Sequence, residues 1–141
     1  MKSLISVKVR SDAFTGSGLA FLKSIQSLRE VTVSSDGFTA EGLESLQHLH
    51  MLTKFDIKTS EVALTGEMMA QVRHLTALKH LRWMDKFNHN EGITDESLAA
   101  LSELNHLEIL ELIHCEKITV GGLFGLAKSC PTLKHIYIPS R

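Results

Sequence analysis

The sequence predicts one α/β domain over residues 1–141, a solenoid in which six short parallel strands line a concave face and about five helices cover the convex face. The first observation is a hexad that begins with Leu and has apolar residues at its fourth and sixth positions. It recurs at Leu4, Leu28, Leu52, Leu78, Leu107 and Leu133, with spacings of 24, 24, 26, 29 and 26 residues. A period of this length corresponds to one supersecondary unit per repeat.

The second observation is the alternation of apolar and polar residues within each hexad, which is typical of a short strand with one buried side. In the fifth repeat Glu111 separates Leu110 from Leu112. The corresponding apolar pairs elsewhere are Val7/Val9, Val31/Val33, Phe55/Ile57, Leu81/Trp83 and Ile136/Ile138. Each pair is predicted to point into the core, so the residues between them face outward.

The third observation is a helical pattern that follows each of the first five strands. After a polar stretch comes a Thr at the position of a helix N-cap: Thr15, Thr39, Thr65, Thr94 and Thr119. Apolar residues spaced by three then follow, as Leu19/Leu22/Ile25, Leu43/Leu46/Leu49, Met69/Val72/Leu75, Leu98/Leu101/Leu104 and Leu123/Leu126. This spacing places them on one helical face, and the Thr hydroxyl can accept a hydrogen bond from a first-turn amide.

These elements must stack on one another. Neither a short helix nor a six-residue strand can bury its apolar side alone, so each unit is stable only against its neighbours. Strands joined through helices in identically oriented units must be parallel. Because helices are wider than strands, we expect the stack to curve with its sheet on the concave side.

The fifth repeat carries a motif that spans a whole unit. It runs Leu107-x-x-Leu110-x-Leu112-x-x-Cys115-x-x-Ile118-Thr119-x-x-x-Leu123-x-x-Leu126-Ala127 and is followed by Cys130-Pro131-x-Leu133. In this motif the chain resembles leucine-rich-repeat proteins, in particular the cysteine-containing, ribonuclease-inhibitor-like repeats of F-box substrate receptors. The resemblance implies a right-handed solenoid that forms a segment of a horseshoe. It further implies a protein-protein interaction module or, alternatively, the substrate-recognition part of an F-box-type ubiquitin-ligase receptor.

The position of Cys115 is occupied by other residues in the first three repeats. Asp12, Asp36 and Ser60 stand there. Asp and Ser side chains can also bond the amides of a turn. We therefore expect the same loop geometry in these repeats.

Composition excludes several classes of partner and location. With 15 basic and 16 acidic side chains, the chain lacks the excess positive charge that phosphate binding requires, so no nucleic acid is expected. The weakly apolar run 3–7 is too short for a signal peptide or a membrane span, so no membrane partner is expected. Two cysteines fall short of a disulfide scaffold, which favours the cytoplasm or the nucleus.

No residue set identifies a reaction, so we expect a protein that is not an enzyme and has no catalytic, cofactor or metal residues. Cys115 follows His114, which leaves a cysteine hydrolase as an alternative. The register nevertheless places Cys115 in a buried turn, where a thiol is usually inert. His48 and His74 occupy equivalent positions in successive repeats, too far apart to share a zinc ion.

The outward-facing strand residues form the expected recognition surface. Asp56, Arg82 and Glu111 alternate in sign along its middle column, which predicts ion pairs that either hold the sheet in register or contact a partner. An apolar group on the last three strands is favoured for binding. The predicted partner-binding residues are Arg82, Met84, Phe87, Ile109, Glu111, Ile113, His135 and Tyr137.

The longer loop 85–92 of the fourth repeat contributes Phe87 to this set. Insertions in repeat proteins gather on loops at one rim and are frequent in binding. Phe87 is the only large apolar residue of this loop. Contact with a partner and packing over Trp83 both remain open for it.

The two ends of the predicted sheet carry no polar cap. A strand begins within a few residues of Met1, and another ends at Ile138. Because uncapped edge strands pair readily with other chains, the alternatives are a part of a longer protein and a homo-oligomer. A self-assembling structural repeat protein is thus a further alternative function.

Overall fold

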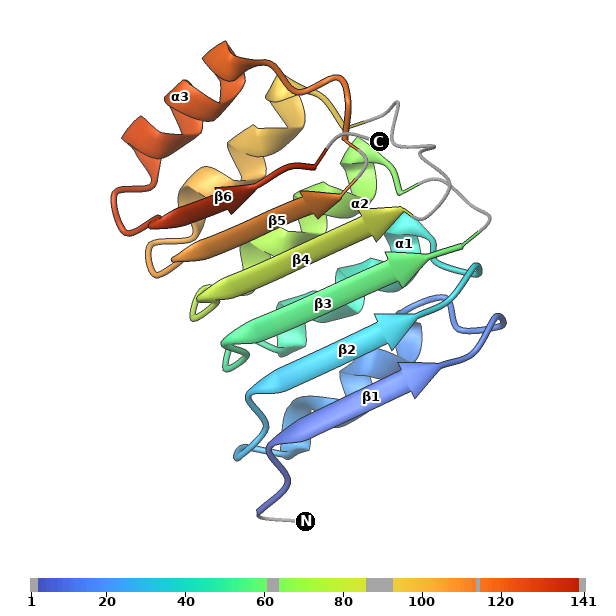
Figure 1. Cartoon of the computed structure of the whole chain (residues 1–141). Helices are drawn as coiled ribbons and strands as arrows, with labels where there is room; N and C mark the ends of the chain where they lie inside the picture. Colours follow the sequence, from blue (N-terminus) through green and yellow to red (C-terminus); the bar gives the residue numbers. More distant parts are fainter. Residues whose placement is uncertain (1–2, 61–63, 86–92, 114, 140–141) are drawn as a thin grey trace.

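Six parallel strands form one sheet in the computed structural model, which describes residues 3–60, 64–85, 93–113 and 115–139. The strands are β1 (Ser6–Arg10), β2 (Glu30–Ser34), β3 (Lys54–Thr59), β4 (His80–Asp85), β5 (Ile109–Ile113) and β6 (His135–Tyr137). They lie in chain order, each paired in parallel with the next (Figure 1). The predicted α/β class with six parallel strands is confirmed.

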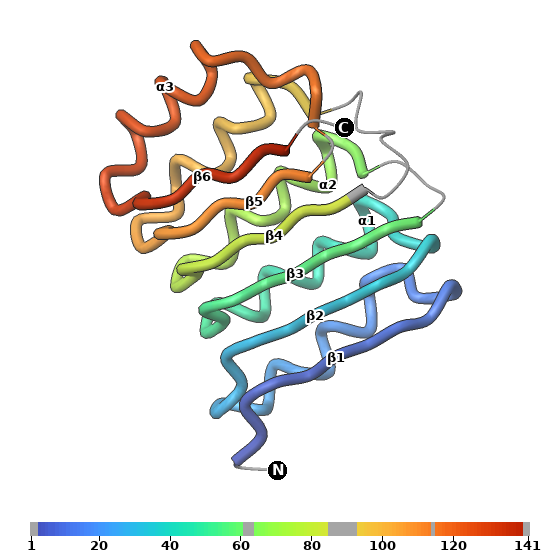
Figure 2. Tube along the Cα trace, viewed as in Figure 1, coloured from blue at the N-terminus to red at the C-terminus, as the bar shows by residue number. Residues whose placement is uncertain are grey.

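A helical segment follows each of the first five strands in the described part of the chain. These segments are η1 (Ser17–Ser24), α1 (Ala40–Leu43) continued by η2 (Glu44–His48), α2 (Gly66–Ala70) continued by η3 (Gln71–His74), η5 (Asp95–Glu103) and α3 (Val120–Ser129). All of them lie behind the sheet, and the trace advances one unit at a time from β1 to β6 (Figures 1 and 2). None of the described helices is both long and apolar enough to cross a bilayer.

Most of the helical backbone is 3-10 helix rather than α-helix. A 3-10 helix has about three residues per turn, so apolar residues spaced by three stay on one side of it. Leu98, Leu101 and Leu104 of the fourth unit are all buried in this way. At α3, a true α-helix, the buried Leu126 and the buried C-cap residue Cys130 are four apart, which fits about 3.6 residues per turn.

The core lies between the sheet and the helical layer. The inward-facing residues of the four inner strands are fully buried: Val31, Val33, Phe55, Ile57, Leu81, Trp83, Leu110 and Leu112. On the two outer strands, Val7, Val9 and Ile136 are only half-buried. The predicted inward orientation is therefore confirmed, and burial is most complete in the middle of the stack.

A repeated backbone contact fixes the spacing of the units. The carbonyl oxygen of Arg29, just before β2, accepts hydrogen bonds from the amides of Thr53 (2.8 Å) and Lys54 (3.1 Å) at the start of β3. The carbonyls of Ile5, Thr53, Lys79 and Glu108 each accept two bonds from the following strand in the same manner. Each unit thereby positions the first residues of the next strand.

A Thr is the N-cap residue in four units, as predicted: Thr39, Thr65, Thr94 and Thr119. The side-chain oxygens of Thr39, Thr65 and Thr119 accept bonds from the amides of Gly42 (2.8 Å), Met68 (3.2 Å) and Gly122 (3.1 Å). These bonds satisfy first-turn amides that have no partner within the helix.

The prediction that Thr15 is an N-cap is wrong. In the first unit the N-cap is Gly16, whose φ is 104°. This left-handed conformation suits glycine because it has no Cβ. The chain therefore enters η1 through a turn one residue later than the Thr pattern predicts.

Asp side chains link successive units. Asp36 Oδ1 accepts a bond from the amide of Ser60 (2.7 Å), the residue at the same place in the next unit. This confirms that an Asp at the position of Cys115 bonds a turn amide. A second link joins the carboxylate of Asp95 to the amide (2.8 Å) and the hydroxyl (2.5 Å) of Thr119.

The link at Asp95 predicts a pH-dependent contribution to stability. The two bonds from Thr119 hold the pKa of the Asp95 carboxyl below its ordinary value of 3.8. A carboxyl with a lowered folded-state pKa stabilises the fold above its unfolded-state pKa, and that stabilisation is lost as the pH falls through the folded-state pKa. Asp95→Asn should therefore destabilise the protein at about pH 7, and its difference from wild type should shrink by about pH 3. Urea unfolding at both pH values measures this, with Glu96→Gln as the control for net charge; a difference independent of pH contradicts the assignment.

Candidate functional site

We call the sheet face opposite the helices the open face (Figure 1). The strand register aligns the outward-facing residues of this face in three columns. The first column is Ser6, Glu30, Lys54, His80, Ile109 and His135; the second is Lys8, Thr32, Asp56, Arg82, Glu111 and Tyr137; the third is Arg10, Ser34, Lys58, Met84 and Ile113. These are the columns that the hexad register predicts. The positions of the candidate residues on the described strands are thus confirmed, independently of what they do.

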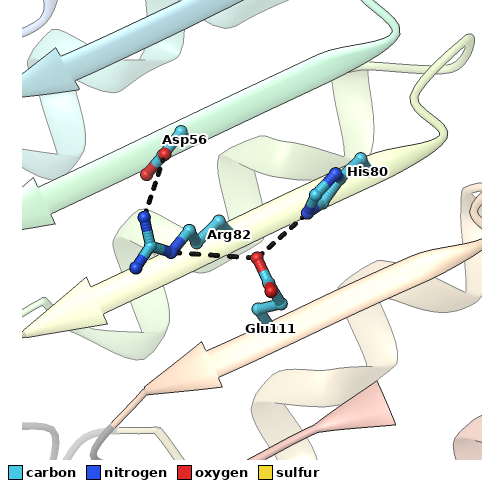
Figure 3. Close-up of polar contacts among 4 residues, drawn as sticks. All are labelled: Asp56, His80, Arg82 and Glu111. Carbon is cyan, nitrogen blue, oxygen red and sulfur yellow. Dashed lines mark hydrogen bonds and ion pairs between the residues drawn. The ribbon is translucent and has the colours of Figure 1, made fainter. Parts of the chain in front are cut away.

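An ion-pair network crosses the middle of the open face (Figure 3). Arg82 on β4 lies between two carboxylates, with Nη1 at 3.5 Å from Asp56 Oδ2 on β3 and Nε at 3.7 Å from Glu111 Oε2 on β5. The same Glu111 oxygen lies 3.0 Å from His80 Nε2. Because an ionised carboxylate only accepts hydrogen bonds, Nε2 is the nitrogen of His80 that carries the hydrogen. The predicted alternation of charge therefore produces real contacts across three strands.

The network orients side chains more than it stabilises the fold. The side chain of Arg82 is 41% exposed, and those of Asp56 and Glu111 are 15% and 28% exposed. Pairs this accessible to water contribute only about 0 to 1 kcal/mol each. Among the described contacts of Arg82, none uses Nη2, so this nitrogen can donate to an acceptor on a partner.

The column pattern in the sequence does not predict the contact between His80 and Glu111. The two residues belong to different columns of the open face, because His80 is paired in register with Ile109 and Glu111 with Arg82. Diagonal neighbours on adjacent strands are about 7–8 Å apart at the backbone, within reach of long side chains. The opposite polarity of His80 and Glu111, which are diagonal neighbours in the predicted register, is the sequence signal that could have predicted this contact.

The predicted apolar group is assembled by the register but unevenly exposed. Met84 lies beside Ile113, and Tyr137 lies beside Glu111. Tyr137 is 57% exposed, whereas Ile113 is only 9% exposed. Met84 and Ile109 are half-buried. Ile113 is therefore the least accessible residue of this group, and Tyr137 is the most accessible.

Comparison with known proteins adds no relative. The chain matches no model of a known protein family and no curated protein. What the site can do therefore follows from its own geometry.

Two further predicted binding residues are His135 and Phe87. His135, the last residue of the first column, is exposed at the start of β6 beside Ile109. Phe87 lies outside the described residues, as does His114, the base of the cysteine-hydrolase alternative. The predicted partner-binding residues that the structure describes are therefore Arg82 and Met84 on β4, Ile109, Glu111 and Ile113 on β5, and His135 and Tyr137 on β6.

Neither of the two cysteines is in a disulfide, and both are buried. Cys115 and Cys130 are each 1% exposed. The thiol of Cys130 donates to the carbonyl oxygen of Leu104 at 3.4 Å, and burial raises the pKa of that thiol. A raised pKa reduces the thiolate fraction, which is the nucleophilic form. No group of three or more His, Cys, Asp or Glu side chains in the described part is arranged to hold a metal ion.

Sequence reasoning also missed two exposed aromatic residues on the helical side. Phe21 in η1 is 85% exposed, and Phe124 in α3 is 63% exposed. Neither belongs to the spaced-by-three pattern that marks the buried helical face. They stand on the first and the last helical segment.

Proposed function

We propose that the protein is a non-enzymatic protein-binding module, a right-handed leucine-rich-repeat solenoid whose concave side is the open face. The parallel sheet in chain order and the helices on one side of it support this architecture. Successive identical units with a rigid strand face commonly present such a surface to partners. The two buried thiols do not favour nucleophilic chemistry.

One observation carries the proposal: a preoriented Arg and an accessible Tyr lie in the same column of the open face, with Glu111 between them. The column runs Arg82, Glu111, Tyr137 on adjacent strands. Tyr and Arg are enriched among residues that dominate binding energy, because each combines a large contact area with hydrogen-bonding groups. Since Asp56 and Glu111 already hold Arg82 in place, binding costs little further side-chain entropy there.

The chemistry of this column defines the partner surface that fits it. Nη2 of Arg82 requires an acceptor, such as a backbone carbonyl or a carboxylate. The Tyr137 ring and the half-buried Met84 and Ile109, all on the open face, favour an apolar contact. We therefore expect a partner that presents an apolar side chain next to a hydrogen-bond acceptor.

The double variant Arg82→Ala/Tyr137→Ala tests this function. Affinity for the partner should fall by at least about 30-fold, because two central contacts are lost together. Proteins captured from a lysate of the source organism by wild type and by the variant are first compared by quantitative mass spectrometry. The affinity of the purified partner is then measured for both by calorimetry.

Arg73→Ala is the matched control, because it removes an exposed Arg from η3 on the helical side. Binding to this control should equal binding to wild type. Equal affinity of the double variant and wild type for every captured partner contradicts the site. Equal loss in the Arg73→Ala control contradicts the choice of face.

A second candidate is the substrate-recognition part of an F-box-type ubiquitin-ligase receptor. The unit β5–α3 supports it, because the two cysteines of the motif are buried in it and the Cys130 thiol bonds the preceding unit at Leu104. In that case the protein should co-purify with a ubiquitin-ligase adaptor, and ubiquitination of the captured partner should fall in the Arg82→Ala/Tyr137→Ala variant. Absence of adaptor association, with partner binding intact, leaves only the general binding function.

We propose the cytoplasm or the nucleus as the compartment. Both cysteines are thiols outside any disulfide, and thiols persist in reducing compartments. Imaging of a tagged chain in the source organism measures this directly.

A further inference from the structure

The first and the last helical segments each expose a Phe at a position that elsewhere in the stack lies along the junction between two units. Phe21 lies in η1 behind β1, and Phe124 lies in α3 behind β6. Their exposed fractions are 85% and 63%. Lys128 Nζ lies 5.1 Å from the centre of the Phe124 ring but leaves most of that side chain accessible.

The position of Phe21 is directed toward the preceding unit. Counting from the first apolar residue of each helical pattern, its equivalents are Ser45 in η2 and Gly125 in α3. The hydroxyl of Ser45 donates to the carbonyl oxygen of Gly16 in the preceding unit at 2.6 Å. Gly125 lines a shallow groove together with Ala99 of the preceding segment, η5.

The position of Phe124 is directed toward the following unit. Its equivalent in η5 is Ala99, which lines the same groove from the opposite side. By the same count, the residues at these two positions across the internal junctions are Ala20/Ser45, Glu44/Gln71, Ala70/Ala100 and Ala99/Gly125. The pairs Glu44/Gln71 and Ala99/Gly125 each line a common groove. None of these pairs is aromatic. If the stack continued into a second copy, Phe124 of one copy would face Phe21 of the next.

The backbone at the two ends has the same complementarity. The carbonyls of Ile5, Arg29, Thr53, Lys79 and Glu108 each receive two amides of the following strand. In the described sheet β6 has a neighbour on one side only, so the carbonyl of Lys134 is the next acceptor of this series. The matching donors are the amides of Ile5 and Ser6, at the free edge of β1.

Side chains at the two edges also fit one another. Val7 and Val9 on β1 and Ile136 on β6 are only half-buried, and a parallel pairing of the two edges would cover them. On the open face, the register would place Lys8 beside Tyr137 and Ser6 beside His135. A Lys over a Tyr ring is attractive, and no pair of like charges is created in these two columns.

We propose that a second copy of this chain docks end to end, with β6 and α3 of one copy against β1 and η1 of the next. The contact continues the parallel pairing that already joins the six strands. The two docked surfaces differ, so the contact is heterologous. Each dimer therefore keeps one unoccupied β1–η1 surface and one unoccupied β6–α3 surface. The product is an open series of oligomers. The proposal is independent of partner binding on the open face.

Sedimentation velocity of the chain from about 1 to about 300 μM tests the proposal. Wild type should show a mass that rises with concentration through dimer and larger species. Phe21→Glu and Phe124→Glu should each shift the association to concentrations at least about 30-fold higher, because a charge is forced into an apolar contact. Thr76→Glu is the control, since it adds the same charge at an exposed residue between η3 and β4 and should associate like wild type.

Mixing the two Phe variants separates this geometry from a symmetric dimer. Phe21→Glu keeps an intact α3 end, and Phe124→Glu keeps an intact η1 end. An equimolar mixture should therefore form a one-to-one heterodimer and nothing larger. A monomer at every wild-type concentration, association unaffected by either Phe substitution, or a mixture without heterodimer would each overturn the proposal. Circular dichroism confirms that both variants are folded.

Discussion

Leu110→Ala is expected to lower the free energy of unfolding by about 2–5 kcal/mol, through lost burial and the cavity left behind. Leu110 is fully buried on β5. Its neighbours in register are Leu81 on β4 and Ile136 on β6. Because a parallel sheet covered by helices on this side cannot collapse freely into the gap, the upper part of this range is expected.

Urea unfolding followed by circular dichroism measures the loss. Ile136→Ala is the matched comparison, because Ile136 occupies the same column on the edge strand but is only half-buried. Its cost should be clearly smaller. A near-neutral Leu110→Ala would mean that the side chain is not in the core, and the strand register would then be in doubt.

Gly42→Ala is expected to cost about 1–3 kcal/mol, through overpacking at the junction of the first two units. A Cβ on Gly42 would collide with the carbonyl group of Thr15 and meet Thr39 Oγ1 at 3.0 Å. The colliding atoms belong to backbone, which cannot rotate away. The helical segment α1–η2 must therefore move away from η1, and the Thr39 cap bond to the Gly42 amide would be strained.

Gly125→Ala provides the contrasting control. A Cβ at this position in α3 meets nothing within 4 Å. The same substitution should there stabilise the protein by up to about 1 kcal/mol, since Ala is the better helix former. Thermal and urea unfolding of both variants under dilute conditions measure the difference. Equal effects of the two substitutions would contradict the close packing at Gly42.

The strands could be predicted from sequence because their physical requirement is simple. A strand with one buried side needs apolar residues at alternate positions, and Leu110 and Leu112 meet this requirement around Glu111. The hexad then fixes which residues stand side by side on neighbouring strands. For this reason the column Asp56, Arg82, Glu111 follows from the amino-acid sequence alone.

The positions of the helical segments were predicted from the sequence, but their 3-10 type was not. Spacing by three residues fits an α-helical stripe roughly and a 3-10 helix well, and a short segment such as 95–103 does not discriminate between them by composition. Gly16 illustrates a second limit. Its left-handed turn depends on close packing against Leu43, whose Cδ2 would lie 2.9 Å from a Cβ at this glycine, and this tertiary contact leaves no local pattern.

The functional candidates show where register alone is insufficient. It correctly aligned Met84 with Ile113, yet Ile113 is buried and Tyr137 is exposed. Exposure depends on what covers a residue from outside its own strand. The two exposed Phe residues were missed for a related reason: an isolated aromatic outside the buried pattern has meaning only when its neighbour across the next junction is known.

The predominance of 3-10 turns bears on the shape of the partner surface that the proposed binding face would fit. A 3-10 helix is wound more tightly than an α-helix, so it takes up less width behind each strand. A narrower helical layer makes the sheet curve less than a wide one. We therefore expect the open face to be a shallow trough rather than a deep arch over most of the sheet. Such a trough would suit the gently rounded surface of a folded protein, in contact with the proposed binding residues Arg82 and Tyr137, more than a peptide enclosed on several sides.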